Sequence, residues 1–139
     1  MLKYIFIIFG AISLIGCNTE NTKTEESEPE PVNSLLAEWD TPYGTPPFDK
    51  IEQQQYQPAF DKAMQMHNDE IEAIATNTET PTFANTIEAL DYSGATLNKV
   101  QNVFNGMNSA LTNDEMQAIS KEVSPLLTEH SDEMTLNDA

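Results

Sequence analysis

The chain has 139 residues, with 6 Lys or Arg against 23 Asp or Glu, and its formal net charge is −17. This charge excludes a nucleic-acid-binding protein, because neutralising backbone phosphates takes clustered basic side chains. The length permits at most one domain of ordinary size.

The N-terminus has the organisation of a lipoprotein signal peptide. Lys3 is followed by the mostly apolar run YIFIIFGAISLIG, which is too short to cross a bilayer comfortably but has the length found in signal peptides. The tetrad LIGC, which ends at Cys17, resembles the bacterial lipobox, in which the thiol is acylated. Cys17 is the only cysteine, so an internal disulfide is impossible. We predict that residues 1–17 are a signal peptide and lipobox with Cys17 as the lipidation site, the alternative being an incidental or buried thiol.

Residues 18–34, NTENTKTEESEPEPVNS, form a separate acidic segment. They contain five Glu, two Pro, one Val and no aromatic residue, so they bury too little apolar surface to offset the entropy of ordering. We predict a disordered tether that holds the folded part away from the membrane. Together with the lipid anchor, this predicts a membrane-anchored protein of the cell envelope that faces the periplasm or the outside.

The folded portion is predicted to span residues 35–139 and to begin with an extended segment. WDTPYGTPPFDKI, which starts at Trp39, contains three Pro, too many for a central strand or a helix interior. We expect this segment to lay its aromatic side chains on a helical surface.

Apolar residues spaced three or four apart predict two helices after this segment. In the first, Pro58 fits the opening turn and the pattern ends near TNTETP. In the second, Thr82 is the expected N-cap, and the stripe continues through Gly94 without losing phase. We therefore predict one continuous helix over residues 83–107, in which Gly94 allows a neighbour to approach closely. The expected core positions are Phe60, Ala63, Met64, His67, Ile71, Ile74, Phe83, Ile87, Leu90, Leu97, Val100, Phe104 and Met107.

A last helix follows NSALTNDE, where Thr112 and Glu115 have the spacing of a capping box. Pro125 is expected to kink this helix. Its expected core positions are Met116, Ile119, Val123, Leu126, Leu127 and His130. Since no alternating strand pattern occurs, the prediction is an all-α fold, a partial helical bundle preceded by a signal peptide and a disordered linker.

His67, His130, Asp132 and Glu133 are the candidate metal ligands. His130 continues the apolar stripe of its helix, whereas Asp132 and Glu133 fall off that stripe, so these side chains do not converge. His130 and Glu133 have the i, i+3 spacing of a helical ligand pair, which is a weak signal alone. If His67 and His130 met in space, a catalytic zinc site would still lack a third ligand and a base. We predict that both are core or interface histidines, and we assign no catalytic, metal-binding or substrate-binding residue.

Five phrases cover almost all of residues 35–137: SLLAEWDTPYGTPPFDKI, YQPAFDKAMQMHNDEIEAI, TPTFANTIEAL, YSGATLNKVQNVF and TNDEMQAISKEVSPLLTEHSDEMTLN. In this order they resemble the N-terminal part of bacterial peptidyl-dipeptidases. These enzymes belong to the zinc oligopeptidase family that includes oligopeptidase A and thimet oligopeptidase. The phrase from Trp39 to Asp49 favours the peptidyl-dipeptidase branch.

The resemblance implies an all-helical, two-lobed metallopeptidase that removes C-terminal dipeptides from short peptides. In that family zinc is held by the two His of H-E-x-x-H and a downstream Glu. No H-E-x-x-H occurs in this sequence, so we expect the chain alone to be inactive and to hold no zinc. Residues 35–139 would then be a truncated N-terminal helical segment, whether from a truncated gene, a partial sequence or a real short protein. The alternative is a non-enzymatic lipoprotein that binds a helix or a peptide on its apolar stripes.

Overall fold

The computed structural model describes residues 32–136. Cys17, the predicted signal peptide, most of the predicted tether and residues 137–139 lie outside the described residues. Within residues 32–136 all regular structure is helical and no strand occurs, which confirms the predicted all-α class. No helix in this range is long and apolar enough to cross a membrane.

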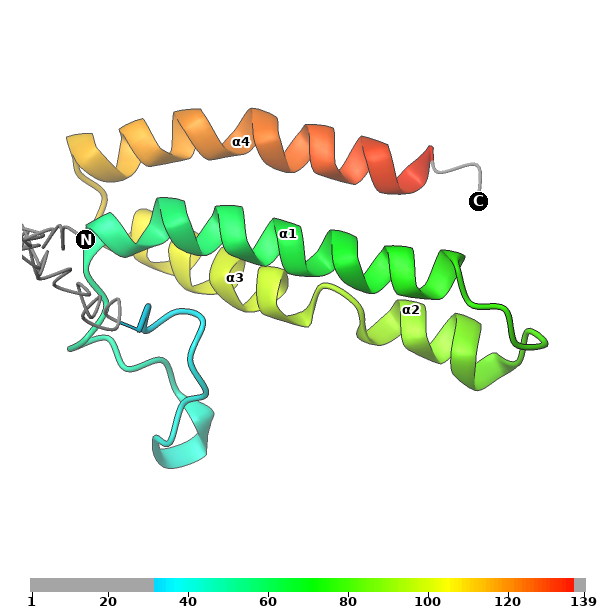
Figure 1. Cartoon of the computed structure of the whole chain (residues 1–139). Coiled ribbons are helices and arrows are strands. Elements are labelled where there is room, and N and C mark those ends of the chain that lie inside the picture. Colours follow the sequence, from blue (N-terminus) through cyan, green and yellow to red (C-terminus); the bar gives the residue numbers. More distant parts are fainter. Residues whose placement is uncertain (1–31, 137–139) are drawn as a thin grey trace, which may run out of the picture. The chain divides into compact units, whose positions relative to one another are not determined.

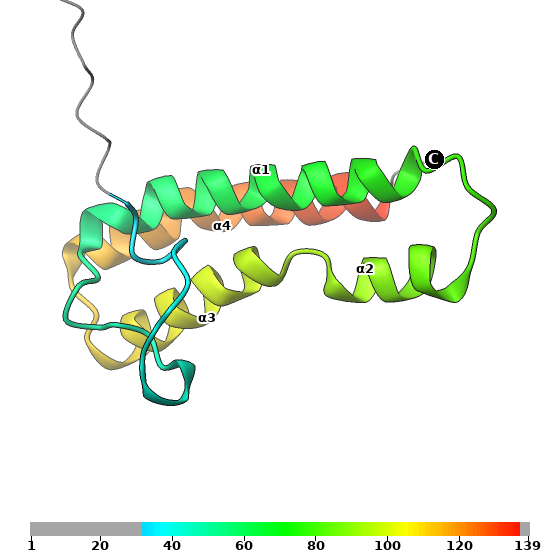
Figure 2. The same cartoon turned by 60° about the horizontal axis from the view of Figure 1, so that its bottom comes forward.

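Two short 3-10 turns precede the helices (Figure 1). In chain order the elements are η1 (Pro42–Gly44), η2 (Gln53–Gln55), α1 (Tyr56–Ala75), the π-helical turn η3 (Phe83–Glu88), α2 (Ala89–Tyr92), α3 (Ala95–Ala110) and α4 (Asp114–Thr135). Figures 1 and 2 both show α1 running alongside α3 and α4, and α1 is the helix that both of them contact. The bundle is therefore organised around α1.

Helix α1 begins and ends where the sequence predicts. Pro58 lies in its first turn, where the missing N–H has no helical partner to lose. Thr76 closes the helix, since its hydroxyl donates to the Glu72 carbonyl at 2.7 Å. Four residues of the first two turns are almost fully buried, namely Tyr56, Ala59, Phe60 and Ala63.

The predicted continuous helix over residues 83–107 is wrong, because the chain breaks at Ser93 and Gly94. The start is as predicted: the Thr82 hydroxyl accepts the Asn85 N–H at 3.1 Å, and the Asn85 side chain accepts the Thr82 N–H at 2.7 Å. Ser93 then takes an extended conformation, and Gly94 has a left-handed φ of 72°. Both views show this irregular connection between α2 and α3 (Figures 1 and 2).

The break changes which stripe positions are buried. On α3, Leu97, Val100 and Phe104 are buried as predicted. Ahead of the break, the predicted core residues Phe83, Ile87 and Leu90 are exposed, and neither η3 nor α2 contains a buried residue. The apolar spacing thus predicted correctly that these residues are helical, but it predicted wrongly that they are buried.

Asn113 caps helix α4, whereas the sequence predicted a capping box of Thr112 and Glu115. The Asn113 side chain accepts the Met116 N–H at 2.9 Å, while the Thr112 hydroxyl turns back to the Asn108 side chain at 3.0 Å. Asn113 is the extended residue directly before the first helical turn, and this position defines the N-cap. The helix continues through Pro125 to Thr135.

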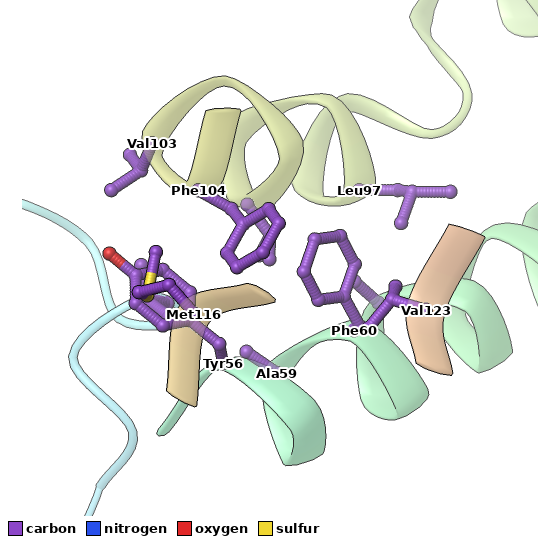
Figure 3. Packing of buried hydrophobic residues seen from close by; sticks show 11 residues of the cluster. Tyr56, Ala59, Phe60, Leu97, Val103, Phe104, Met116 and Val123 are labelled. Atoms are coloured by element: carbon purple, nitrogen blue, oxygen red, sulfur yellow. The ribbon is translucent and has the colours of Figure 1, made fainter. Parts of the chain in front are cut away.

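The core is centred on aromatic rings of α1 and α3 (Figure 3). Phe104 meets Tyr56 and Phe60 in edge-to-face contacts, with ring centroids 5.1 and 5.4 Å apart. Met116 and Val123 of α4 are buried in the same cluster. The Tyr56 hydroxyl is buried without a hydrogen-bond partner among the described residues, and burial raises the pKa of Tyr56.

Ordered structure begins before residue 35, the predicted start of the folded portion. The Asn33 amide donates to the Gln55 carbonyl at 2.8 Å, and its side-chain oxygen accepts the Leu35 N–H at 3.0 Å. These bonds hold Leu35, which has no exposed surface, in the core. Asn33 therefore belongs with the folded part.

The proline-rich segment covers α3 with only part of its aromatic surface. The Trp39 indole donates to the Ser34 carbonyl at 2.9 Å, and its ring lies 4.8 Å from the Lys99 ammonium. Lys99 also donates to the Ala37 carbonyl at 3.0 Å, and burial lowers the pKa of Lys99, partly opposed by Glu38. Tyr43 is fully exposed, so the prediction that these aromatics pack on a helix is wrong for Tyr43, whereas Phe48, which is 54% exposed, lines a pocket with Val103 and Met107 of α3.

We expect Phe104→Ala to lower the free energy of unfolding by about 3–5 kcal/mol, because it removes both ring contacts and leaves a cavity beside α1. Chemical denaturation followed by circular dichroism measures this. Phe83→Ala is the matched control, since Phe83 is 72% exposed and its loss should change stability by less than about 0.5 kcal/mol. Equal effects of the two substitutions would contradict the assigned core.

Candidate functional site

Three elements meet in a polar cluster, which consists of His67, Glu70, Ser93, Gly94 and His130. His67 and Glu70 lie on α1, Ser93 and Gly94 form the break before α3, and His130 lies on α4. The nitrogens His130 Nε2 and His67 Nδ1 are 3.0 Å apart, and the ring centroids are 5.1 Å apart. His130 is 6% exposed and His67 is half-buried, so both occupy the interface positions predicted for them.

The Leu90 carbonyl, at one end of a series of hydrogen bonds through Ser93 and His67 to His130, determines which atom donates in each bond. Ser93 Oγ lies 2.7 Å from the Leu90 carbonyl, which can only accept, so the hydroxyl proton points there. Ser93 Oγ then accepts from His67 Nε2 at 3.3 Å. A neutral imidazole with its proton on Nε2 has a lone pair on Nδ1, so His130 Nε2–H donates to His67 Nδ1.

Gly94 is required by both its backbone conformation and its surroundings. Its φ of 72° is strained for any residue with a Cβ. A Cβ at this position would lie 2.7 Å from His67 Cε1 and 2.9 Å from each ring nitrogen. The Gly94 N–H donates to Glu70 Oε2 at 2.7 Å, which fixes the backbone against α1. The close approach predicted at Gly94 is therefore present, although the continuous helix is not.

The electrostatics of the cluster favour a neutral His67. Burial lowers the pKa of His67, the neighbouring His130 lowers it further, and the Glu70 carboxylate opposes both effects. A lowered pKa keeps the imidazole uncharged at neutral pH, as the chain of hydrogen bonds requires.

The cluster does not have the arrangement of a nucleophilic site. Ser93, His67 and His130 follow one another as serine, base and orienting residue would. However, the Ser93 proton is committed to the Leu90 carbonyl, and His67 Nε2 donates to Ser93 instead of accepting from it. The His67 nitrogen that faces the hydroxyl, Nε2, therefore has no lone pair with which to activate it.

The residues of the cluster also do not fit a catalytic zinc ion. Such an ion takes three protein ligands and an open position. The Nδ1 atom of His67 accepts from His130, and the Glu70 carboxylate accepts from Gly94. Asp132 and Glu133 are exposed. Between residues 32 and 136, no three His, Cys, Asp or Glu side chains are placed to hold a metal ion.

Sequence reasoning placed the two histidines correctly on their helices but did not predict their contact. They are separated by 63 positions, and periodicity assigns a face without assigning a partner. Ser93 and Glu70 were missed entirely. The only signal for the cluster was Gly94, where the apolar stripe passes through a glycine.

Comparison with known proteins finds similarity to two dipeptidyl carboxypeptidases. No family model matches the chain. The dipeptidyl carboxypeptidase of Escherichia coli (strain K12) is 43% identical over 106 residues, which are 76% of this chain and 16% of that protein. The dipeptidyl carboxypeptidase of Salmonella typhimurium (strain LT2) is 42% identical over 107 residues, or 77% and 16%.

These identities confirm the predicted relationship to the peptidyl-dipeptidases. The matched region is homologous to part of a dipeptidyl carboxypeptidase. The chain spans only 16% of the length of either relative, so it corresponds to a segment of such a protein.

We expect Gly94→Ala to destabilise the fold by more than about 2 kcal/mol, because it combines left-handed strain with a collision against the His67 ring. Substitutions at two other glycines separate the effect of backbone strain from the effect of the collision. Gly44 has a φ of 64° and open space around it, so Gly44→Ala tests strain alone. Gly106 lies in α3 with nothing near its Cβ position, and Gly106→Ala should stabilise the chain by about 0.5–1 kcal/mol. Denaturation of all three variants measures the order, and a Gly94→Ala cost no larger than that of Gly44→Ala would contradict the collision.

Proposed function

We propose that this chain provides a helical segment of a zinc-dependent peptidyl-dipeptidase, a hydrolase that removes C-terminal dipeptides from short peptides. The observation that carries the proposal is the 43% identity to a dipeptidyl carboxypeptidase over 76% of the chain. In this proposal the helices form part of the wall of the peptide channel, and short unfolded peptides are the substrates.

The exposed apolar residues are consistent with packing against further protein. Phe83, Ile87, Leu90 and Tyr92 are exposed on consecutive turns of η3 and α2. Apolar surface grouped in this way marks a contact in larger assemblies. The same residues favour the alternative function, a non-enzymatic lipoprotein that binds a partner helix or peptide there.

In the proposed enzyme, an H-E-x-x-H segment that this sequence does not contain would supply two zinc ligands and the general base, and a downstream Glu would be the third ligand. Zinc would supply a polarised water for hydrolysis of the peptide bond. The role of the described helices would be to shape the path of the peptide, and we assign them no step of the chemistry.

A chimera tests the proposal directly. The matched segment of the E. coli dipeptidyl carboxypeptidase is replaced by the corresponding residues of this chain, and dipeptide release from a short peptide is measured together with bound zinc. We expect zinc to be retained and the rate to lie within about tenfold of the parent enzyme, or about 1.4 kcal/mol, because the replaced helices position and do not react. The isolated chain should neither retain zinc after dialysis nor release dipeptides.

Two controls make the result interpretable. The same chimera carrying Phe104→Ala should lose stability and activity together, since the segment must fold to form the wall. A folded, zinc-loaded chimera that releases no dipeptide would contradict the enzymatic proposal. Tight zinc and chelator-sensitive cleavage by the isolated chain would instead show a metal site that our assignment excludes.

We also propose that Cys17 carries a lipid anchor and that the protein is held at a membrane of the cell envelope. The support is the apolar run followed by LIGC in the sequence. Intact-mass measurement on the protein purified from a bacterial membrane should show a chain that begins at Cys17 with added acyl mass. Cys17→Ala is the control and should leave an unprocessed chain without that mass. A mature chain that begins at Cys17 without lipid would contradict the anchor.

A further inference from the structure

The polar cluster joins α1 and α4 beyond the last fully buried apolar residue of either helix. The fully buried apolar residues of α1 all lie between Tyr56 and Ala63, ahead of His67. Val123 is the last buried apolar residue of α4, two turns before His130. Beyond these positions, His130 is the only buried residue of α4 within the described range, and it faces His67.

We propose that the His67–His130 pair is an acid-sensitive latch, which fastens the C-terminal half of α4 to α1 at neutral pH and releases it when both rings are protonated. The bond from His67 Nε2 to Ser93 Oγ is kept in both states, because a protonated ring still donates from Nε2.

The mechanism depends on the number of lone pairs between the rings. Two neutral rings keep a lone pair on His67 Nδ1 for the bond at 3.0 Å. One neutral and one charged ring can still share a single bond, with the neutral ring as acceptor. When both rings are protonated, all their nitrogens become donors, and two positive charges face each other across the same distance. The bond is then lost and replaced by repulsion.

The charged neighbours affect the pH at which the latch opens, but they do not prevent it from opening. On α1, the Glu70 carboxylate favours a proton on His67, but this carboxylate is already bonded to the Gly94 N–H. The break presents the Ser93 hydroxyl, and Asp91 beside it is exposed. On α4, Glu129, Asp132 and Glu133 flank His130 in sequence and are exposed, so water screens their attraction for a proton.

The lowered pKa of His67 fixes the sign of the pH dependence. A group with a lowered pKa in the folded state binds its proton more readily in the unfolded chain, where the pKa of histidine is about 6.5. Stability is therefore fully present above about pH 6.5 and falls as the pH drops below that value. The unfolding equilibrium constant should rise by up to about tenfold for each unit by which the pKa is lowered.

The test is denaturation of the full chain in a mild detergent at about pH 7.5 and about pH 5.5, above the range in which ordinary carboxyl groups titrate. His130→Phe keeps a ring in the buried position but removes the donor and the second charge. We expect the acid-induced rise in the unfolding constant to be at least about threefold smaller in this variant than in the wild type, because the neighbouring charge that lowers the pKa of His67 is gone. Val123→Ala is the matched control on α4, because it should weaken the α1–α4 contact at both pH values and leave the acid-induced rise unchanged.

A second measurement on the wild type is independent of the variant's folding. The sequence contains only two histidines, so their ring signals can be followed by NMR through a pH titration. We expect His67 to titrate below its ordinary range and its nitrogens to report a proton on Nε2 at neutral pH. Titration of His67 at or above about 6.5, or an unchanged acid response in folded His130→Phe, would overturn the latch.

Discussion

The structure depends on the edge-to-face contacts of Phe104 with Tyr56 and Phe60, because these contacts hold α3 against α1. Met116 and Val123 of α4 close the same cluster from another helix. Each aromatic pair contributes about 0.5–1.5 kcal/mol beyond the burial of its surface. The apolar driving force is thus concentrated at one end of α1, where Leu35 also enters the core.

The fold was largely predictable where one helix face is fully buried. Phe60, Val100 and Val123 lie on apolar stripes with a period close to that of the helix, and all three are in the core. The apolar stripe wrongly predicted that Phe83 is buried. The sequence pattern keeps its phase across Gly94, while the backbone does not continue as a helix there. A left-handed glycine can redirect the chain without disturbing the sequence pattern, so periodicity alone does not locate the break.

The candidate site was less predictable, because its contacts are set by tertiary packing. His67 and His130 each fit an apolar stripe, and the sequence gives no measure of which stripe faces which. The resemblance to peptidyl-dipeptidases was confirmed by the 43% identity to part of the E. coli dipeptidyl carboxypeptidase. It assigned no role to either histidine, since the family's zinc motif has no counterpart in this sequence.

The two ends of α1 therefore hold their neighbours by different forces. At the first end, ring packing seats α3 and α4, and this contact is insensitive to pH. At the second end, η3 and α2 contain no buried residue, and two hydrogen bonds join the break to α1: His67 Nε2 donates to Ser93 Oγ, and the Gly94 N–H donates to the Glu70 carboxylate. The exposed Phe83 and Leu90 belong to these same elements, so this apolar surface is joined to α1 through polar contacts at the break. Protonation of both histidines would break the His130–His67 bond and leave these two bonds intact, because His67 Nε2 keeps its proton and Gly94 bonds to Glu70.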